Sequence, residues 1–371
     1  MAYQIDELLK QARGIGASDL HVTTGIPPKC RLNGELIEIA HDPVLPADSK
    51  ALVEQMIPGR LVDRFNEEGE VDFSYAIRGV GRYRVNIFKQ RGTMAFVIRL
   101  VNTDIPSPEQ LGLPKSVLDL TTKKRGLVLV TGPTGSGKST TLYTVLSELN
   151  QGTVNIITVE DPVEANVDGI NQVQTNDKAG LTFASALRSI LRQDPDIIMI
   201  GEIRDGETAG IAVKAAITGH LVVSTLHTNS AASTITRLED MGVEPYLIAD
   251  SVVGIIAQRL VRRLCPKCKK GHELNDEDKL RLRIRGDSKP TIYEACGCAA
   301  CNGTGYRGRI GVYEIMPITP AIRKIVAAEG NADEIQKVAL EEGLTTLRMG
   351  AAKLVLKGIT TINEVERIAT E

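Results

Sequence analysis

The 371-residue sequence contains no tryptophan, and aromatic residues make up only 4% of it. Aromatic side chains provide the stacking platforms on which proteins hold unpaired bases, so this composition disfavours a protein that grips single-stranded nucleic acid. The net charge also disfavours nucleic-acid binding, because the formal net charge is −2 and the isoelectric point is near 6.3. Such a balance gives no overall attraction to nucleic acid or to anionic lipid.

Long apolar runs are also missing. Segments such as LVLVTG and DIIMIG have the length of strands, well short of the roughly 18 apolar residues of a membrane span. The N-terminal sequence has neither the basic and apolar regions of a signal peptide nor the arginine-rich character of a transit peptide. We therefore expect a cytoplasmic protein, and we expect any membrane contact to be peripheral.

The N-terminal third predicts a small α+β domain. Residues 1–103 alternate strand-like segments, such as DLHVTT and YRVNIFKQ, with one helical stretch near residues 48–68. Proline and turn residues are frequent over residues 104–120, which predicts a linker.

The pattern then changes to that of an α/β protein. Over residues 121–264, short strands rich in Val, Ile and Leu alternate with longer helical segments, which predicts a buried parallel sheet. A cysteine-bearing module follows over residues 265–312. Residues 313–371 predict a helical region whose helices are separated by Gly330, Gly343 and Gly358.

A phosphate-binding loop is predicted where an apolar strand meets a helix. Residues 132–139 read GPTGSGKS, the G-x-x-x-x-G-K-S pattern. The glycines let successive N–H groups point at phosphate oxygens, Lys138 adds a positive charge, and the Ser139 hydroxyl can ligate Mg²⁺. A glycine turn that caps a helix by chance is the alternative, which the order of strand, loop and helix disfavours. The expected ATP contacts are Gly132, Pro133, Thr134, Gly135, Ser136, Gly137, Lys138, Ser139 and Thr140.

Hydrolysis also needs a carboxylate that orients or deprotonates water. Glu160 follows one apolar strand, in ITVEDPVE, and Glu202 follows another, in DPDIIMIGEIRD. The carboxyl ends of parallel strands converge on the ligand. We predict Glu202 as the catalytic base in preference to Glu160, and either residue could instead be a solvated turn carboxylate.

Two histidines lie at the ends of a further strand-like segment, TGHLVVSTLHTN. His220 and His227 are seven residues apart, so on a strand their side chains point to opposite faces and should serve different purposes. One could sense the γ-phosphate or a neighbouring subunit while the other only satisfies hydrogen bonds. We take His227 as the catalytic candidate.

Two C-x-x-C pairs, separated by 29 residues, predict a structural metal site. Four thiolates presented from two such turns suit tetrahedral Zn²⁺ and leave no open position for catalysis. Chance pairs in a reduced core and a redox pair are the alternatives. Cys296 is near enough to replace Cys298, and Cys30 predicts an ordinary core residue. The expected zinc ligands are Cys265, Cys268, Cys298 and Cys301.

The motifs GPTGSGKST, ITVEDPVE, LRQDPDIIMIGEIRD and TGHLVVSTLHTN resemble, in order, the Walker A, Asp-box, Walker B and His-box motifs of the type II secretion and type IV pilus ATPase superfamily. The resemblance implies a RecA-like ATPase core preceded by a PAS-like domain. It also implies a homohexameric ring in which each PAS-like domain packs on a neighbour's core. Nucleotide-driven rotation in such rings moves an inner-membrane platform protein.

The same resemblance implies that arginines of the N-terminal domain reach the phosphates. Arg82, Arg84 and Arg99 lie in the matching stretch, and Arg84 is the preferred candidate. An arginine brought across a closing interface stabilises charge on the transferred phosphoryl group. Exposed arginines on a half-buried strand are the alternative. Where secretion-type members often carry Gly-Glu-Arg, this chain has Gly-Thr-Met at residues 92–94.

The cysteine module separates the functions within the superfamily. Assembly-type members carry it, followed by a segment like GTGYRGRIGVYE at residues 303–314, and retraction motors usually lack it. The resemblance therefore implies an assembly or secretion motor with a short N-terminus, with retraction as the alternative. A nucleic-acid translocase is a further alternative, suggested by basic residues at 259–270 that we interpret as a solvated face. A scaffold that binds ATP without hydrolysing it is disfavoured by the two glutamates.

Overall fold

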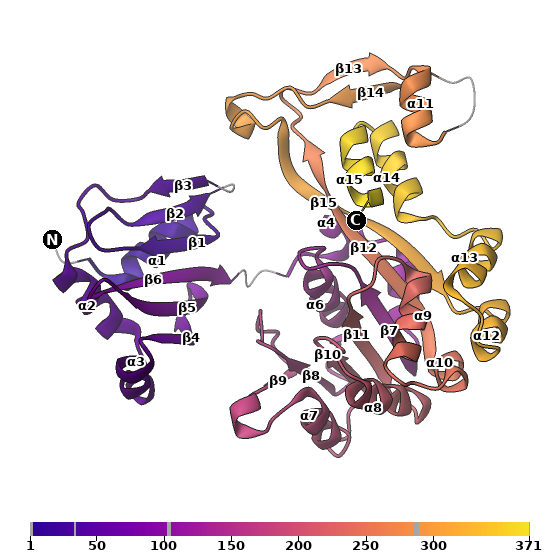
Figure 1. Cartoon of the computed structure of the whole chain (residues 1–371), viewed down its shortest axis with the longest axis horizontal. Helices are drawn as coiled ribbons and strands as arrows, with labels where there is room; N and C mark the ends of the chain where they lie inside the picture. The colour runs from indigo at the N-terminus through magenta and orange to yellow at the C-terminus, as the bar shows by residue number, and fades with distance from the viewer. Residues whose placement is uncertain (1–2, 33–34, 102–104, 285–288, 371) are drawn as a thin grey trace. The chain divides into compact units, whose positions relative to one another are not determined.

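The computed structural model describes residues 3–32, 35–101, 105–284 and 289–370 and confirms an α/β protein (Figure 1). The chain divides into two compact units. The first contains Met1–Asp104 with Glu164–Asn166, and the second contains Ile105–Val163 with Val167–Glu371. None of the described helices is long and apolar enough to cross a membrane.

The first unit is built on an antiparallel sheet with the strand order β3-β2-β1-β6-β5-β4. The strand-like segments of the sequence all lie in this sheet. Its strands are β1 (Asp19–Val22), β2 (Lys29–Leu32), β3 (Glu35–Glu38), β4 (Glu70–Ile77), β5 (Gly81–Gln90) and β6 (Thr93–Val101). The predicted helical stretch is present as α2 (Pro46–Met56), η1 (Gly59–Leu61) and α3 (Val62–Glu68).

Helix α1 (Ile5–Gly14) is an element that the sequence prediction missed. Its buried side chains, Ile5, Leu8, Leu9 and Ala12, recur at the spacing of one helix face. They join the core of the first unit together with Leu20, from β1. The periodicity was therefore readable in the sequence.

The second unit is built on a mixed sheet with the strand order β15-β12-β7-β11-β10-β8-β9. All neighbours are parallel except β15, which runs antiparallel to β12. The parallel sheet predicted for residues 121–264 is thus present, and β15, from outside that range, adds an antiparallel edge strand. The strands are β7 (Gly126–Thr131), β8 (Ile156–Glu160), β9 (Asn171–Gln174), β10 (Ile197–Ile200), β11 (Leu221–Leu226), β12 (Val252–Leu264) and β15 (Tyr306–Pro317).

Helices pack on this sheet and bury a continuous apolar core. Residues 105–120, which the sequence predicted as part of a linker, contain two short helices, α4 and α5. The helices before β12 are α4 (Pro108–Leu111), α5 (Lys115–Thr121), α6 (Lys138–Leu149), η2 (Asp177–Ala179), α7 (Phe183–Ile190), α8 (Gly206–Ile217), α9 (Ala231–Asp240) and α10 (Pro245–Ser251).

The cysteine-bearing segment and the C-terminal helices complete the second unit. The cysteine-bearing segment forms β13 (Lys270–Glu273), α11 (Asp276–Leu282), β14 (Thr291–Glu294) and η3 (Ala299–Cys301), with β13 antiparallel to β14. The C-terminal helices are separated near the three glycines that the sequence singled out. They are α12 (Pro320–Ala327), α13 (Ala332–Glu341), α14 (Leu347–Leu356) and α15 (Ile362–Thr370).

Candidate functional site

The glycine-rich loop lies between the end of β7 and the start of α6, as the sequence predicts. Gly137 precedes the helix in the left-handed region, with φ of 88°, which glycine adopts at little cost. Ser139 and Thr140, in the first turn of α6, are exposed. The Ser139 hydroxyl is thus open to a metal ion beside the N-terminus of a helix, where backbone N–H groups favour anions.

Lys138 is held against this loop. Its ammonium group is buried and donates to the carbonyl oxygens of Gly132, at 2.7 Å, and Pro133, at 3.1 Å. Burial lowers the pKa of Lys138, the Arg259 guanidinium lowers it further, and the Glu202 carboxylate acts in the opposite direction. The loop therefore concentrates positive charge where phosphate groups would bind.

Glu202 lies directly beyond β10, on the edge of the sheet where the parallel strands end. Its side chain is 18% exposed and accepts a hydrogen bond of 2.5 Å from Arg204. Its other oxygen is 3.7 Å from His227 Nε2. Since Glu202 also acts on Lys138, the structure brings three predicted residues together at the loop.

The two histidines occupy opposite ends of β11, as expected. Burial lowers the pKa of His227, Lys138 and Arg204 lower it further, and Glu202 opposes them. The lowered pKa favours the neutral form of His227 near pH 7, in which its contact with Glu202 is a polar contact between a neutral ring and a carboxylate. At the other end of the strand, His220 Nδ1 contacts the Ala215 carbonyl at 3.0 Å.

Glu160 lies at the end of β8 in a different environment. Its side chain is buried and accepts hydrogen bonds from the Tyr143 hydroxyl, from Thr158 Oγ1 at 2.5 Å and from Gln172 Nε2 at 3.1 Å. These donors occupy three of the roughly four acceptor positions of the carboxylate. The arrangement favours Glu202 as the proton acceptor.

Arg84 lies on β5 of the first unit and is exposed. In the sheet register it faces Ser74 on β4 and Arg99 on β6. Arg99 donates to the buried Asp19 carboxylate at 3.0 Å, so it has a role within its own unit. Of these two arginines, Arg84 is therefore the better candidate to bind an anion from outside its own unit.

The four predicted metal ligands form a cluster. Their sulfur atoms all lie within 4.8 Å of one another, which suits a single tetrahedral ion. The backbone N–H groups of Cys298 and Gly305 donate to Cys301 Sγ, each at 3.2 Å. Although burial acts to raise it, these donors and the neighbouring Cys268 and Cys298 lower the pKa of Cys301 to about 6, which favours the thiolate form that ligates a metal ion.

The other two cysteines lie outside this cluster. Cys296 is exposed, and the group of four contains Cys298 instead. Cys30 lies fully buried on β2, in the core of the first unit, and burial raises the pKa of its thiol to about 11. Cys30 is thus a core residue, as the sequence predicts.

The interpretation of residues 259–270 as a solvated basic face is wrong for Arg259. Arg259 is only 2% exposed and lies beside the phosphate loop. Arg262 donates to the buried Glu364 at 2.8 Å. The Lys269 ammonium donates to the Gly358 carbonyl at 2.9 Å and lies 4.2 Å from the centre of the Tyr293 ring. Arg262 stays exposed and Lys269 is half-buried, so both combine an internal contact with access to solvent.

Sequence reasoning missed Gln258, which precedes Arg259 in the middle of β12. Its side chain is 2% exposed and donates to the Ser136 carbonyl of the phosphate loop at 2.9 Å. The sequence feature that could have revealed Gln258 is a pair of polar residues within an apolar segment, IIAQRLV. Such a pair in a buried strand indicates a specific partner.

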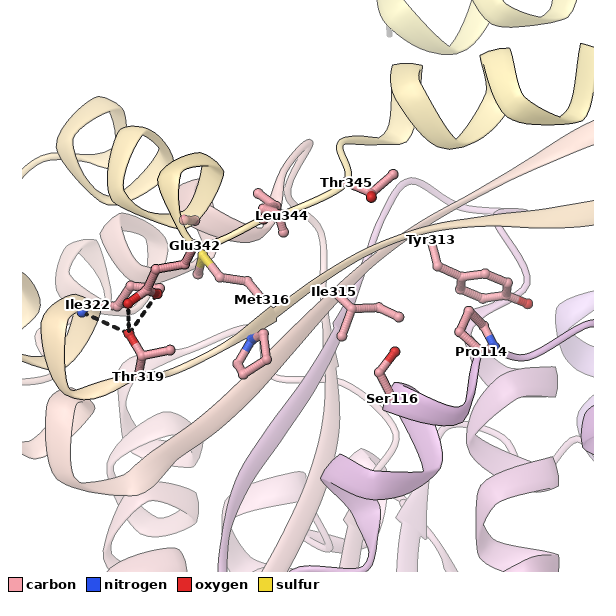
Figure 2. Close-up of a pocket in the computed structure, with 13 residues that line it drawn as sticks. Pro114, Ser116, Tyr313, Ile315, Met316, Thr319, Ile322, Glu342, Leu344 and Thr345 are labelled. Atoms are coloured by element: carbon pink, nitrogen blue, oxygen red, sulfur yellow. Dashed lines mark hydrogen bonds between the residues drawn. The ribbon is translucent and has the colours of Figure 1, made fainter. Parts of the chain in front are cut away.

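A cavity of about 470 Å³ lies on the β15 side of the same unit, between α5, β15 and the helices α12 and α13. Figure 2 shows the Thr319 hydroxyl at one end of it, donating to Glu342 at 2.8 Å and capping α12 through the Ile322 N–H. None of the described residues that line this cavity is among the site residues predicted from the sequence. It belongs to the junction between the sheet and the C-terminal helices.

Comparison with known proteins connects this geometry to a family. The family model described as "Type II/IV secretion system protein" matches residues 4–367. The type IV pilus assembly ATPase PilB of Acinetobacter baylyi is 42% identical over 99% of this chain and 66% of its own length. The type II secretion system protein E of Pseudomonas aeruginosa is 40% identical over 99% of this chain and 75% of its own.

A solved structure agrees over the whole chain. The pilus retraction motor PilT with bound ADP has a TM-score of 0.81 at 34% identity, covering 100% of this chain and 98% of that one. The chain thus spans 66% to 75% of the two curated relatives and nearly all of this structure. With the phosphate loop, the two glutamates and the four-cysteine cluster in place, the chain belongs to the family of type II/IV secretion ATPases.

Proposed function

We propose that this chain hydrolyses ATP to power assembly of a type IV pilus or of a type II secretion pseudopilus. The observation that carries the proposal is the similarity, over 99% of the chain, to a pilus assembly ATPase and to a type II secretion protein. The cluster formed by Cys265, Cys268, Cys298 and Cys301 supports assembly, because the resemblance assigns such a module to assembly-type members.

In the proposed mechanism, the backbone N–H groups of residues 132–140 and the Lys138 ammonium hold the phosphates. Mg²⁺ bound at the Ser139 hydroxyl would neutralise part of the phosphate charge. Glu202 orients a water molecule and accepts its proton as the new oxygen–phosphorus bond forms and the bond from the γ-phosphorus to the bridging oxygen breaks. His227, 3.7 Å from Glu202, senses whether the γ-phosphate is present.

We further propose the organisation that this work requires. The N-terminal part, residues 1–103, acts as a PAS-like domain joined through residues 104–120 to a RecA-like core at residues 121–264. Residues 265–312 bind structural Zn²⁺, and residues 313–371 form a helical region. Six copies form a ring at the cytoplasmic face of the membrane, where Arg84 reaches a neighbour's phosphates and a platform protein receives the motion.

Retraction is the second candidate, favoured by the structural similarity to the retraction motor PilT. It differs from assembly in the direction of the work and leaves the proposed chemistry unchanged. The four-cysteine cluster is the observation that favours assembly over it.

The test replaces the chain in its source organism with the Glu202→Gln variant and counts surface fibres and secreted substrate. Loss of fibres or of secretion supports an assembly motor. An excess of fibres shows that the chain drives retraction and rejects the assembly proposal. Unchanged fibres and secretion reject both. A Glu207→Gln variant, changed at an exposed residue of α8, is the matched control.

A further inference from the structure

The Gln258 side chain joins two parts of the phosphate site. Its Nε2 donates to the Ser136 carbonyl, and its Oε1 accepts from Thr141 Oγ1, each at 2.9 Å. A carbonyl oxygen can only accept, so the amide nitrogen must face Ser136 and the orientation of the amide is fixed. Strand β12 thereby clamps the loop before α6 to a residue in the first turns of that helix.

Close packing between β12 and the loop reinforces this clamp. A Cβ atom on Gly137 would lie 2.9 Å from Gln258 Nε2, and one on Gly132 would lie 2.5 Å from the Gln258 carbonyl oxygen. Both glycines also have positive φ angles, of 88° and 146°. The motif therefore needs glycine at these two positions for contact with Gln258 as well as for its backbone conformation.

The geometry of the peptide bond gives the clamp a consequence for nucleotide binding. The Ser136 carbonyl and the Gly137 N–H belong to one planar trans peptide unit, so they point in opposite directions. A bond that holds the carbonyl toward β12 turns the N–H away from β12. Backbone N–H groups of this loop are the donors that receive phosphate oxygens.

We propose that Gln258 is a positioning residue of the phosphate loop, which orients the Gly137 N–H toward a bound phosphate by holding the Ser136 carbonyl. Gln258 meets the chemical requirements because it combines a donor and an acceptor at one end of a side chain that reaches across from a buried strand. The inference rests on the nucleotide site proposed above.

The test measures the dissociation constants of ATP and ADP for the purified full-length chain by competition with a fluorescent nucleotide. Gln258→Met keeps the length of the side chain and removes both hydrogen bonds, and we expect about tenfold weaker binding of both nucleotides. Thr141→Val should weaken binding less, and Thr141→Ser should restore it. Arg263→Gln, changed at an exposed residue of the same strand, is the control and should bind normally.

A second variant provides a readout that a merely structural role would not change. In Gln258→Glu the ionised carboxylate cannot donate to Ser136, whereas the protonated carboxyl group can. Burial raises the pKa of the introduced carboxyl group, and the neighbouring Arg259 guanidinium lowers it. The affinity of this variant relative to wild type should recover as the pH falls through that pKa. This comparison tests the positioning role of Gln258 even if the Gln258→Met variant does not fold.

The outcomes separate this inference from the proposed function. If Lys138→Ala abolishes nucleotide binding while Gln258→Met binds as wild type does, Gln258 has no positioning role and the nucleotide site stands. Wild-type affinity in Gln258→Glu at about pH 8, where an ionised carboxylate cannot donate to Ser136, also overturns the inference. If the wild-type chain itself binds neither ATP nor ADP, the proposed function fails together with it.

Discussion

At the scale of single residues, the two glutamates beyond the parallel strands have different surroundings. Glu160 is buried beneath three donors, from Tyr143, Thr158 and Gln172. Glu202 is partly exposed, beside His227 and within electrostatic reach of Lys138. Two glutamates that both follow an apolar strand can therefore differ in how readily their carboxylates accept a proton. The hydrogen-bond donors that the fold places around each carboxylate determine this difference.

We expect Glu202→Gln to lower the rate of ATP hydrolysis by about 10²- to 10⁴-fold, because the amide cannot accept a proton from water. The affinity for ATP should change little, since the phosphate-binding groups remain. Phosphate release and nucleotide binding by the purified chain measure the two effects, with Glu207→Gln as the control. If Glu160→Gln abolishes turnover while Glu202→Gln retains it, the two roles are exchanged.

The sequence was sufficient to predict residues whose chemistry depends on a local motif. The phosphate loop and the four cysteines lie at fixed spacings, so their geometry follows from a short segment. Gln258 was not predicted because its partners, Ser136 and Thr141, are more than a hundred residues away. Arg259 was misread for the same reason, since only the tertiary fold shows that it is buried.

At the scale of elements, helix α15 is fastened to strand β12 by one buried carboxylate. The Glu364 oxygens accept from the backbone N–H of Arg262 at 2.8 Å, from its guanidinium at 2.8 Å and 3.0 Å, and from Arg367 at 3.0 Å. Burial acts to raise the pKa of Glu364, and the bonds from Arg367 and Arg262 outweigh it, so the pKa is lowered.

We expect Glu364→Gln to lower the free energy of unfolding by about 2 kcal/mol, the value of a charge-assisted hydrogen bond in a buried site. A chemical denaturation curve at neutral pH measures this loss. Glu366→Gln, on the same helix, is the matched control. Its half-exposed pair with Arg281 should contribute less than about 1 kcal/mol. Equal losses in the two variants would contradict the assignment.

The pH dependence of the same contact has a defined sign. The pKa of Glu364 in the folded chain lies below its ordinary value of 4.5. Its stabilising effect is therefore fully present above that value and is lost as the pH falls through the lowered pKa. The difference in stability between wild type and Glu364→Gln should shrink on acidification within this window.

The cysteine cluster leads to a prediction about metal. We expect the purified chain to contain about one zinc ion, and we expect its removal by a chelator to lower the melting temperature by about 5 °C. Cys298→Ser should lose the ion. The nearby Cys296→Ser is the matched control and should keep it, because Cys296 is exposed and lies outside the cluster. Equal zinc content in the two variants would reject the ligand set.

The sequence was less informative about elements than about motifs. Helix α1 was missed although its buried residues follow one helix face, since the surrounding strand-like segments dominated the interpretation. The antiparallel edge strand β15 was not predicted because its partner, β12, precedes it by a long excursion through the cysteine-bearing hairpin. Strand direction in a sheet depends on such connections, which local patterns do not record.

At the scale of the whole molecule, the proposed ring requires that one chain complete the active site of the next. Arg84 lies on the first unit and the phosphate loop lies in the second. In a head-to-tail ring, an arginine can reach the neighbouring chain without reaching the loop of its own. Complementation between two inactive variants distinguishes these arrangements.

We expect Arg84→Ala and Lys138→Ala each to abolish most ATP hydrolysis, and an equal mixture of the two to regain activity. A mixed ring contains sites in which an intact phosphate loop from one variant faces an intact Arg84 from the other, and random assembly gives about a quarter of all sites this composition. Phosphate release after mixing and reassembly measures the recovery.

The control mixes Lys138→Ala with Glu202→Gln. Both residues belong to the phosphate site of their own chain, so every site in the mixed ring keeps one defect and should remain inactive. Recovery in the first mixture and not in the second requires Arg84 to act on a neighbour. If neither mixture recovers, although Arg84→Ala alone is inactive, Arg84 acts within its own chain and the proposed exchange between neighbours is wrong.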